Sequence, residues 1–242
     1  MSAHSVSNGA GQDPAAMAGI DLVIFDCDGV LIDSEAISAR MLVAELAGRG
    51  VAIDLDYVRR HFLGRSYPVV LKQIRRDFGL DLPRDFEAGY RARLLAAFER
   101  ELTVMPGVEA VLDALGPPAW LATSSSAARL ARSLEIAGLA ARFEGRVTTA
   151  SEVAHGKPAP DLFLHAAAQA GAVPPRCLVI EDSLMGIAAA RAAGMAVWHF
   201  TGGSHQRDAP APPADAPRAD ATLRDFSEFF TLAPGLRREG GP

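Results

Sequence analysis

The sequence predicts an α/β protein built on a doubly wound parallel sheet, with a domain of helices inserted after the first strand. Two observations support this prediction. Short, continuous apolar runs alternate with helical patterns along most of the chain, as expected for parallel strands that are covered on both faces. One interval, residues 33–103, breaks the alternation because only helical patterns occur in it.

Five apolar runs predict strands, and a weaker sixth follows them. These runs are Asp21–Phe25, Ala119–Thr123, Gly145–Thr148, Cys177–Ile180, Met195–Phe200 and, as the weakest, Ala221–Leu223. Small and apolar residues at helical spacing predict the intervening helices Gly107–Leu115, Ser126–Ala137, Pro160–Ala170 and Ser183–Ala193. A Pro-, Ala- and Asp-rich stretch at 202–219 predicts an irregular surface loop, and Asp225–Leu232 predicts a short closing helix.

Residues 33–103 are large enough for a subdomain and begin directly after the first strand. Their predicted helices are Ser34–Arg49, Leu55–Phe62, Pro68–Phe78 and Arg84–Leu102. We therefore expect a helical cap at 33–103 above a core formed by 19–32 and 104–232, with a disordered leader at 1–18 and a tail at 233–242. A single continuous α/β domain with extra helices is the alternative.

Composition limits the classes of function. A formal charge of −5 and a pI near 5.7 argue against nucleic-acid binding, and no apolar stretch is long enough to span a membrane. The only two cysteines, Cys27 and Cys177, cannot form a disulfide framework and suit a cytoplasmic protein. Residues 1–18 lack the features of a secretory signal. We expect a monomer or weak dimer.

The first predicted strand ends in two carboxylates, Asp26 and Asp28, followed by Gly29. Desolvating carboxylates is unfavourable unless a cation or hydrogen-bond donors compensate. An Asp-rich turn with Gly29 at positive φ would also explain this pattern. The alternative that we favour is a site in which one carboxylate attacks or binds metal and the other moves protons.

Four consecutive hydroxyl side chains, Thr123–Ser126, follow the second strand and precede a helix. Hydroxyls and free backbone N–H groups at the start of a helix can bind an anion. Capping of the helix would need only one serine, such as Ser125 or Ser126. The excess of hydroxyls favours an anion site that includes Thr123, Ser124 and Ser125.

Two later segments extend the candidate site. Lys157 lies between a glycine and a proline before a helix, a context equally consistent with a solvated loop lysine. Glu181 and Asp182 end the fourth apolar run and repeat the acidic pattern of the first strand. Helix capping by Asp182 or Ser183 is the simpler explanation. Because two strands of one sheet each end in paired acids, we favour a site for Mg²⁺, which prefers oxygen ligands.

In their order along the chain, these four segments resemble the motifs of the haloacid-dehalogenase-like (HAD) hydrolases. The similarity is to the branch of β-phosphoglucomutases and phosphoglycolate phosphatases, which carry a helical cap. It extends from about Ile20 to Phe230. The resemblance implies a Rossmann-like core whose first strand lies between the strand ending at Thr123 and the strand ending at Glu181, so that all four motifs meet at one edge.

The resemblance also implies a role for each motif residue. Asp26 would be the nucleophile that forms an aspartyl-phosphate, and Asp28 would protonate the leaving alcohol and then activate water. Thr123 and Lys157 would bind the phosphoryl group. The implied ligands of Mg²⁺ are Asp26, the backbone carbonyl of Asp28, Asp182 and Glu181, the last either directly or through water.

These roles predict a Mg²⁺-dependent phosphatase that acts on a small, sugar-phosphate-like metabolite. A haloalkanoate dehalogenase would need neither Mg²⁺ nor an acid at position 28. A β-phosphoglucomutase-like mutase is the closer alternative, but Ser38 stands where those mutases carry a histidine, and Arg65 is out of the expected register. A non-catalytic binding module would be expected to lack at least one motif residue, and all are present.

The cap is expected to select the substrate, because the core motifs contact only the phosphoryl group. Glu35 and Ser38 lie on the first predicted cap helix, and Gly64, Arg65 and Ser66 form a donor-rich segment beside a glycine hinge. We expect these five residues to contact the substrate. The low aromatic content favours small polar phosphates over nucleotides.

Overall fold

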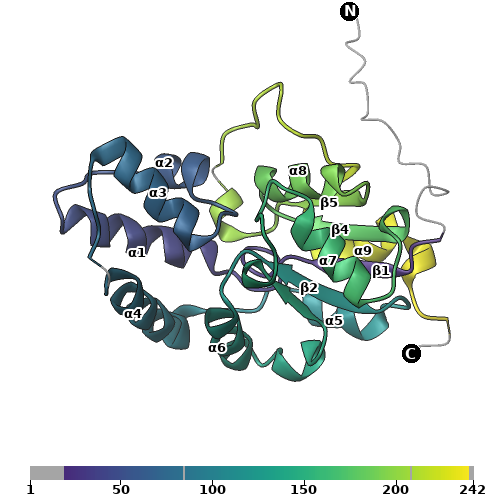
Figure 1. Ribbon diagram of the computed structural model, residues 1–242. Coiled ribbons are helices and arrows are strands. Elements are labelled where there is room, and N and C mark those ends of the chain that lie inside the picture. Colours follow the sequence, from purple (N-terminus) through teal and green to yellow (C-terminus); the bar gives the residue numbers. More distant parts are fainter. Residues whose placement is uncertain (1–18, 84, 208, 240–242) are drawn as a thin grey trace, which may run out of the picture.

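The computed structural model describes residues 19–83, 85–207 and 209–239. Its centre is a six-stranded parallel sheet in the order β3-β2-β1-β4-β5-β6 (Figure 1). The strands are β1 (Leu22–Phe25), β2 (Ala119–Thr123), β3 (Val147–Thr149), β4 (Cys177–Glu181), β5 (Ala196–Phe200) and β6 (Ala221–Leu223). This is the strand order of a doubly wound sheet, so the predicted fold class and the two predicted neighbours of β1 are confirmed.

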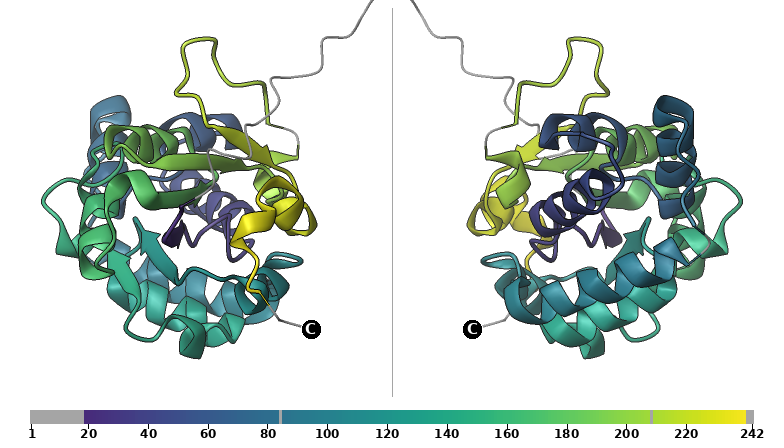
Figure 2. Two further views of the ribbon diagram at one scale, coloured as in Figure 1. Left: turned by 90° about the vertical axis from the view of Figure 1, so that its right-hand side faces the viewer. Right: turned by 90° about the vertical axis from the view of Figure 1, so that its left-hand side faces the viewer.

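Helices cover both faces of the sheet, as the two views of Figure 2 show. The helices α5 (Val108–Ala114), α6 (Ala127–Ala137) and α9 (Phe229–Leu232) pack on one face, and α7 (Asp161–Gln169) and α8 (Leu184–Ala192) pack on the other. Successive side chains of β1 alternate between the two hydrophobic clusters: Val23 and Phe25 enter the first, and Leu22 and Ile24 the second. The central strands β1, β2, β4 and β5 are therefore apolar on both sides, whereas the edge strands β3 and β6 contribute to the first cluster alone.

The first four of the five helices between β1 and β2 form what we call the helical insert (Figure 1). They are α1 (Glu35–Ala47), α2 (Leu55–His61), α3 (Tyr67–Phe78) and α4 (Phe86–Glu101). The insert has a hydrophobic cluster of its own, centred on buried residues such as Leu46, Ile74 and Phe98. Asp54 caps α2 by accepting from the N–H of Tyr57, and Gly79 ends α3 in the left-handed conformation.

The predicted boundaries of these strands and helices agree with the structure to within two residues, but two local predictions need correction. The closing helix predicted at Asp225–Leu232 begins as a 3-10 turn at Phe226–Glu228, because the Asp225 carboxylate accepts from the N–H of Ser227. The stretch 202–219 is not uniformly irregular or superficial, since Ser204–Gln206 forms a 3-10 turn with a buried His205. The predicted disordered leader at 1–18 lies outside the described residues.

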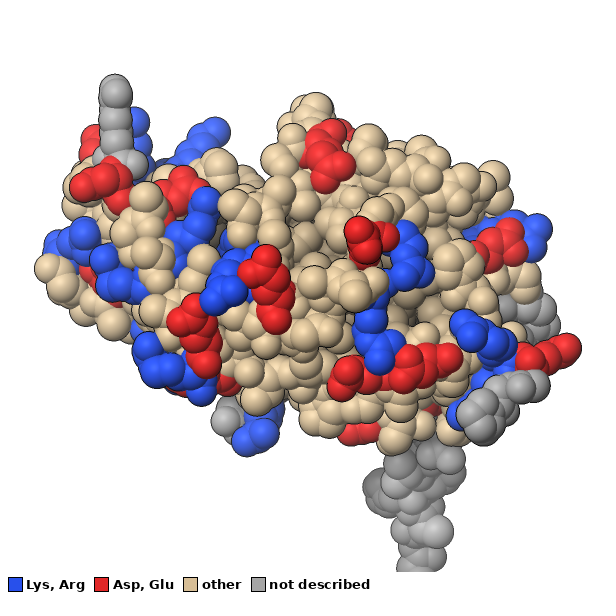
Figure 3. All heavy atoms as spheres, turned by 90° about the horizontal axis from the view of Figure 1, so that it is seen from below, with Lys and Arg blue, Asp and Glu red and all other residues tan. Residues whose placement is uncertain are grey.

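Charged side chains are distributed over the surface without segregation by sign in the view from below (Figure 3). Among the surface ion pairs, Arg132 pairs with Glu99 and Glu135, and Arg142 pairs with Asp113. Across the described ranges, no helix combines the length and the apolar character needed to cross a bilayer. Exposed pairs of this kind add little stability, so the apolar clusters hold the fold together.

Leu46→Ala should destabilise the protein by about 2–5 kcal/mol, because the fully buried side chain leaves a cavity in the insert. Leu55→Ala is the matched control, since Leu55 is 47% exposed at the start of α2 and should change stability by no more than about 0.5 kcal/mol. Urea unfolding of both variants measures the difference. Equal losses would show that the insert is not held together by its own core.

Candidate active site

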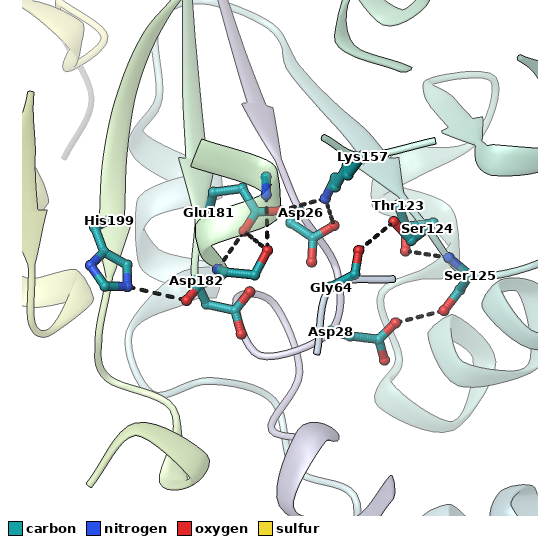
Figure 4. Close-up of polar contacts among 12 residues, drawn as sticks. Asp26, Asp28, Gly64, Thr123, Ser124, Ser125, Lys157, Glu181, Asp182 and His199 are labelled. Carbon is teal, nitrogen blue, oxygen red and sulfur yellow. Dashed lines mark hydrogen bonds and ion pairs between the residues drawn. The ribbon is translucent and has the colours of Figure 1, made fainter. Parts of the chain in front are cut away.

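The carboxyl ends of β1, β2 and β4 bring the predicted motif residues together at one edge of the sheet (Figure 4). Asp26 directly follows β1, while Thr123 and Glu181 are the last residues of β2 and β4. Lys157 reaches the same place from the loop that precedes α7. Because neighbouring parallel strands end at a common edge, residues about 150 positions apart in the chain are adjacent here.

Lys157 lies between two carboxylates at the centre of this edge. Its Nζ donates to Oδ1 of Asp26 at 2.7 Å and also to Oε1 of Glu181, and all three side chains are buried. Burial alone would lower the pKa of the ammonium, but the charges of Asp26 and Glu181 together raise it. The lysine is therefore held in its charged form, and the alternative of a solvated loop lysine is wrong.

A cluster of three buried carboxylates fits a divalent cation. Asp26, Glu181 and Asp182 each offer an oxygen, and these oxygens lie within 4.8 Å of one another. Burial raises the pKa of Asp26 and Asp182, and the neighbouring acids raise both further. Lys157 compensates only part of this charge. An all-oxygen set with excess negative charge suits a hard cation such as Mg²⁺.

The remaining contacts of Glu181 bear on whether it binds such a cation directly. Its Oε2 accepts from the N–H of Ser183 at 2.6 Å and from the Ser183 hydroxyl at 3.0 Å, while its Oε1 accepts from Lys157. Ser183 also caps α8 by accepting from the N–H of Gly186 at 3.0 Å, so the predicted capping role of this serine is confirmed. Glu181 is thus the most fully hydrogen-bonded acid of the cluster.

Asp28 occupies a separate polar pocket. Its carboxylate accepts from the hydroxyls of Ser34 at 2.6 Å and Ser125 at 2.7 Å, and from Nη2 of Arg129 at 2.8 Å. The positive φ of the following Gly29, +80°, turns the chain so that Asp28 faces the helical insert. The turn with Gly29 at positive φ, which was the alternative to a functional site, is therefore present, and it positions the Asp28 carboxylate.

Sequence reasoning missed Arg129 and Ser34. Arg129 lies in the first turn of α6, lines the cavity described below, and approaches the Ser38 hydroxyl at 3.4 Å. A positive side chain in the first turn of a helix interacts unfavourably with the helix dipole. Such a residue could have been suspected of pairing with an acidic group outside the helix. Ser34 had no comparable signal, because its contact with Asp28 depends on the bend between β1 and α1.

The hydroxyl segment at the end of β2 does not act mainly as a helix cap. Ser126 occupies the N-cap position of α6, yet its side chain makes no capping hydrogen bond. Thr123 Oγ1 instead accepts from the N–H of Ser125 at 3.1 Å, and Ser124 donates to the carbonyl of Gly64 in the insert at 2.9 Å (Figure 4). These contacts hold Thr123–Ser126 at the carboxyl edge of the sheet, where their hydroxyl and backbone N–H groups would be needed to bind an anion.

A cavity of about 440 Å³ lies between the sheet edge and the helical insert. The predicted site residues that line it are Asp26, Asp28, Glu35, Ser38, Gly64, Arg65, Ser66, Thr123, Ser124, Ser125 and Lys157. The aromatic residues Phe62, Tyr67 and Tyr90 line it too, which the low aromatic content did not suggest. Tyr67 and Tyr90 stack on each other, with ring centroids 6.0 Å apart.

The insert contributes to the cavity two ionisable residues that the sequence had already suggested, Glu35 and Arg65. Burial, followed by the charges of Asp28 and Asp182, raises the pKa of Glu35 to about 8. Arg65 extends Nη2 toward Sδ of Met185 at 3.7 Å, so it spans from the insert to the start of α8. The cavity therefore combines a carboxyl group and a guanidinium on its insert side.

Lys157→Met should destabilise the metal-free protein by about 3–5 kcal/mol, because it leaves Asp26 and Glu181 buried without their cation. Arg176→Met is the control, since Arg176 and Asp21 form a pair in which both side chains are about half exposed, and its loss should cost at most about 1 kcal/mol. Urea unfolding in chelator measures both. A Lys157 variant as stable as the control would contradict the burial of these charges.

Comparisons with known proteins show the family of this chain. A family model described as haloacid dehalogenase-like hydrolase matches residues 20–194. The chain is 28% identical over 192 residues to 6-phosphogluconate phosphatase of Escherichia coli (79% of this chain, 87% of the relative). It is 33% identical over 178 residues to fructose-1-phosphate phosphatase of E. coli (72% and 92%).

A solved structure agrees over nearly the whole chain. It is a HAD family hydrolase from Deinococcus radiodurans with bound phosphate and sodium, 35% identical with a TM-score of 0.69, and the match covers 91% of this chain and 98% of that one. The family match spans all four motif segments, from Asp26 to Asp182. The chain therefore belongs to the haloacid dehalogenase-like hydrolases, as its motifs indicated.

Proposed function

We propose that this chain is a Mg²⁺-dependent phosphatase that hydrolyses a small, sugar-like phosphomonoester through an aspartyl-phosphate on Asp26. The observation that carries this proposal is the buried arrangement of Lys157, Asp26 and the acids that end β4. Family relatives named as phosphatases of 6-phosphogluconate and fructose 1-phosphate support the choice of substrate class.

In the first step, a carboxylate oxygen of Asp26 attacks phosphorus and the bond between phosphorus and the ester oxygen breaks. Lys157 holds the nucleophile in place and offsets its charge. Asp26, Asp182 and the carbonyl of Asp28 would hold Mg²⁺, with Glu181 contributing directly or through water. When bound, the cation would neutralise charge on the carboxylate and the phosphoryl oxygens.

Asp28 is the group that we expect to move protons. Asp28 must enter the cycle with a proton taken up from solvent; it donates this proton to the oxygen of the leaving alcohol, and later recovers one from the water that attacks phosphorus and breaks its bond to Asp26. The products are the alcohol and inorganic phosphate, and both carboxyl groups return to their initial states. Ser34, Ser125 and Arg129 fix the Asp28 side chain before substrate binds, so one of these contacts is exchanged for the leaving oxygen.

The helical insert is suited to act as a cap over this chemistry. It touches the core through the hydrogen bond from Ser124 to the Gly64 carbonyl and through the contact of Arg65 with Met185. Closure of such a cap excludes water and brings specificity groups to the substrate. Glu35, Ser38 and Arg65 offer polar partners for the hydroxyl groups of a sugar phosphate.

Hydrolysis is favoured over isomerisation. A mutase needs a group on the first cap helix that helps to transfer protons to and from the sugar, and the corresponding position here is Ser38. Its hydroxyl lies 3.4 Å from Arg129, and a serine is a poor proton acceptor at neutral pH. We therefore expect release of phosphate rather than its return to another position of the sugar.

Asp26→Asn should abolish turnover of a chromogenic phosphate ester, and chelation should abolish turnover by the unsubstituted enzyme. Asp113→Asn is the control, because Asp113 pairs with Arg142 on the surface and should leave the rate unchanged. Equal rates with Mg²⁺ and with chelator would contradict the metal dependence. Formation of glucose 6-phosphate from β-glucose 1-phosphate with a trace of the bisphosphate would support the mutase instead.

Arg65→Ala should raise KM about tenfold for the best sugar phosphate found in a substrate screen, because a hydrogen bond from a charged donor is lost. The KM for a generic aryl phosphate should stay nearly the same, since this substrate offers the cap no hydroxyl groups. Arg60→Ala is the control, because Arg60 is exposed on α2 and its side chain donates to the Asp56 carbonyl of its own helix. Equal effects on both substrates would place specificity elsewhere in the insert.

A further inference from the structure

The segment Gly203–Gln206 lies directly beside the candidate metal site, although the sequence predicted only an irregular surface loop there. It follows β5 and forms the 3-10 turn Ser204–Gln206. His205 is 7% exposed and points back into the protein rather than outward. In addition to the four motif segments, this turn therefore also reaches the carboxyl edge of the sheet.

The turn and the neighbouring strand surround Asp182 with three side chains. Nε2 of His205 lies 2.9 Å from Oδ2 of Asp182, and the two side chains are 5% and 3% exposed. Gln206 donates from Nε2 to the backbone carbonyl of Asp182 at 2.7 Å, and Nε2 of His199 lies 3.1 Å from the same oxygen (Figure 4). Both the carboxylate and the backbone of this one acid are therefore held from the β5 side.

His205 and Asp182 both have buried polar atoms that need a hydrogen-bond partner. Within the described residues, Asp182 Oδ2 and the ring nitrogens of His205 have no partner with full hydrogen-bond geometry. Buried polar atoms without partners are rare and call for an explanation. The 2.9 Å approach places two of these atoms, Nε2 of His205 and Oδ2 of Asp182, within hydrogen-bond distance of each other.

The turn is anchored so that His205 cannot easily move away. The N–H and the hydroxyl of Ser204 both donate to Oδ1 of Asp33, at 3.1 and 2.8 Å. A Cβ atom on Gly203 would lie 2.7 Å from Cε1 of His205, and one on Gly29 would lie 2.0 Å from Oδ2 of Asp182. Only glycines fit at these two positions, which shows how closely the turn, the first motif and Asp182 are packed.

Carboxylates that bind a metal are usually held by hydrogen bonds from a surrounding layer of residues, and loss of such a partner typically weakens metal binding by about 10- to 100-fold. We propose that His205 is a positioning residue that orients the Asp182 carboxylate for the divalent cation. This inference rests on the metal site proposed above. Among the described residues, those that line the 440 Å³ cavity do not include His205, so it acts through Asp182 and not on the substrate.

The test measures metal binding directly, at one fixed pH. Mn²⁺ binding is followed by the electron paramagnetic resonance signal of the free ion, and Mg²⁺ binding by competition with Mn²⁺. His205→Ala should raise the dissociation constants of both ions at least about tenfold. His205→Gln should keep them within about threefold, because the Gln amide can place a donor near the position of Nε2.

Matched variants separate positioning from a general loss of structure. His165→Ala is the control, because His165 is a partly exposed histidine of α7 that faces Glu152, and its loss should leave both constants unchanged. Thermal unfolding in chelator reports the stability of each metal-free variant. If His205→Ala fails to fold, His205→Asn replaces it. The Asn side chain is shorter than Gln, so its amide does not reach the Asp182 carboxylate.

The possible outcomes are distinct. A His205→Ala protein that folds and binds Mn²⁺ and Mg²⁺ within twofold of the unsubstituted chain would overturn the inference, as would equal weakening in the Ala and Gln variants. Weaker metal binding together with recovery of kcat at saturating Mg²⁺ would support it. Failure of the unsubstituted protein to bind either ion would instead refute the metal site on which the proposed function depends.

Discussion

The excess of buried negative charge at the carboxyl edge of the sheet is the constraint on which this structure depends. Asp26, Glu181 and Asp182 are withdrawn from water within a few ångströms of one another, and Lys157 is the one ammonium that contacts them in the described structure. Such an arrangement is unfavourable for folding by itself, because burial penalises each charge and the carboxylates repel each other. It is maintained because the surrounding sheet and loops determine where these groups lie, and because phosphoryl transfer requires concentrated charge.

The fold produces this concentration by simple means. β1 lies between β2 and β4, so three chain segments that carry polar residues at their ends meet at the point where the order of connections reverses. These three strands are apolar on both faces and pair with one another in a fixed register, which positions the residues at their carboxyl ends. The helical insert leaves the sheet at the same edge and therefore covers the site without any change in the sheet itself.

A second layer of residues holds the acids that line the site. Arg129, Ser34 and Ser125 hold Asp28, while the turn that contains His205 and Gln206 holds Asp182. The first group comes from α6, from the segment between β2 and α6, and from the residue before α1, and the second comes from the segment after β5. The orientations of the two carboxylates thus depend on contacts from different parts of the chain.

The sequence by itself determined the sheet, the helices and the four motif segments, because apolar periodicity and charges at strand ends are local signals. It also suggested Glu35, Ser38 and Arg65, which line the cavity, since they lie near the first motif or beside a glycine hinge. Only the tertiary structure decided which groups hold these residues. Arg129 lies 101 positions from Asp28, and His205 is in a stretch whose composition resembles a loop. Their contacts arise from the packing of segments distant in sequence, which no local pattern records.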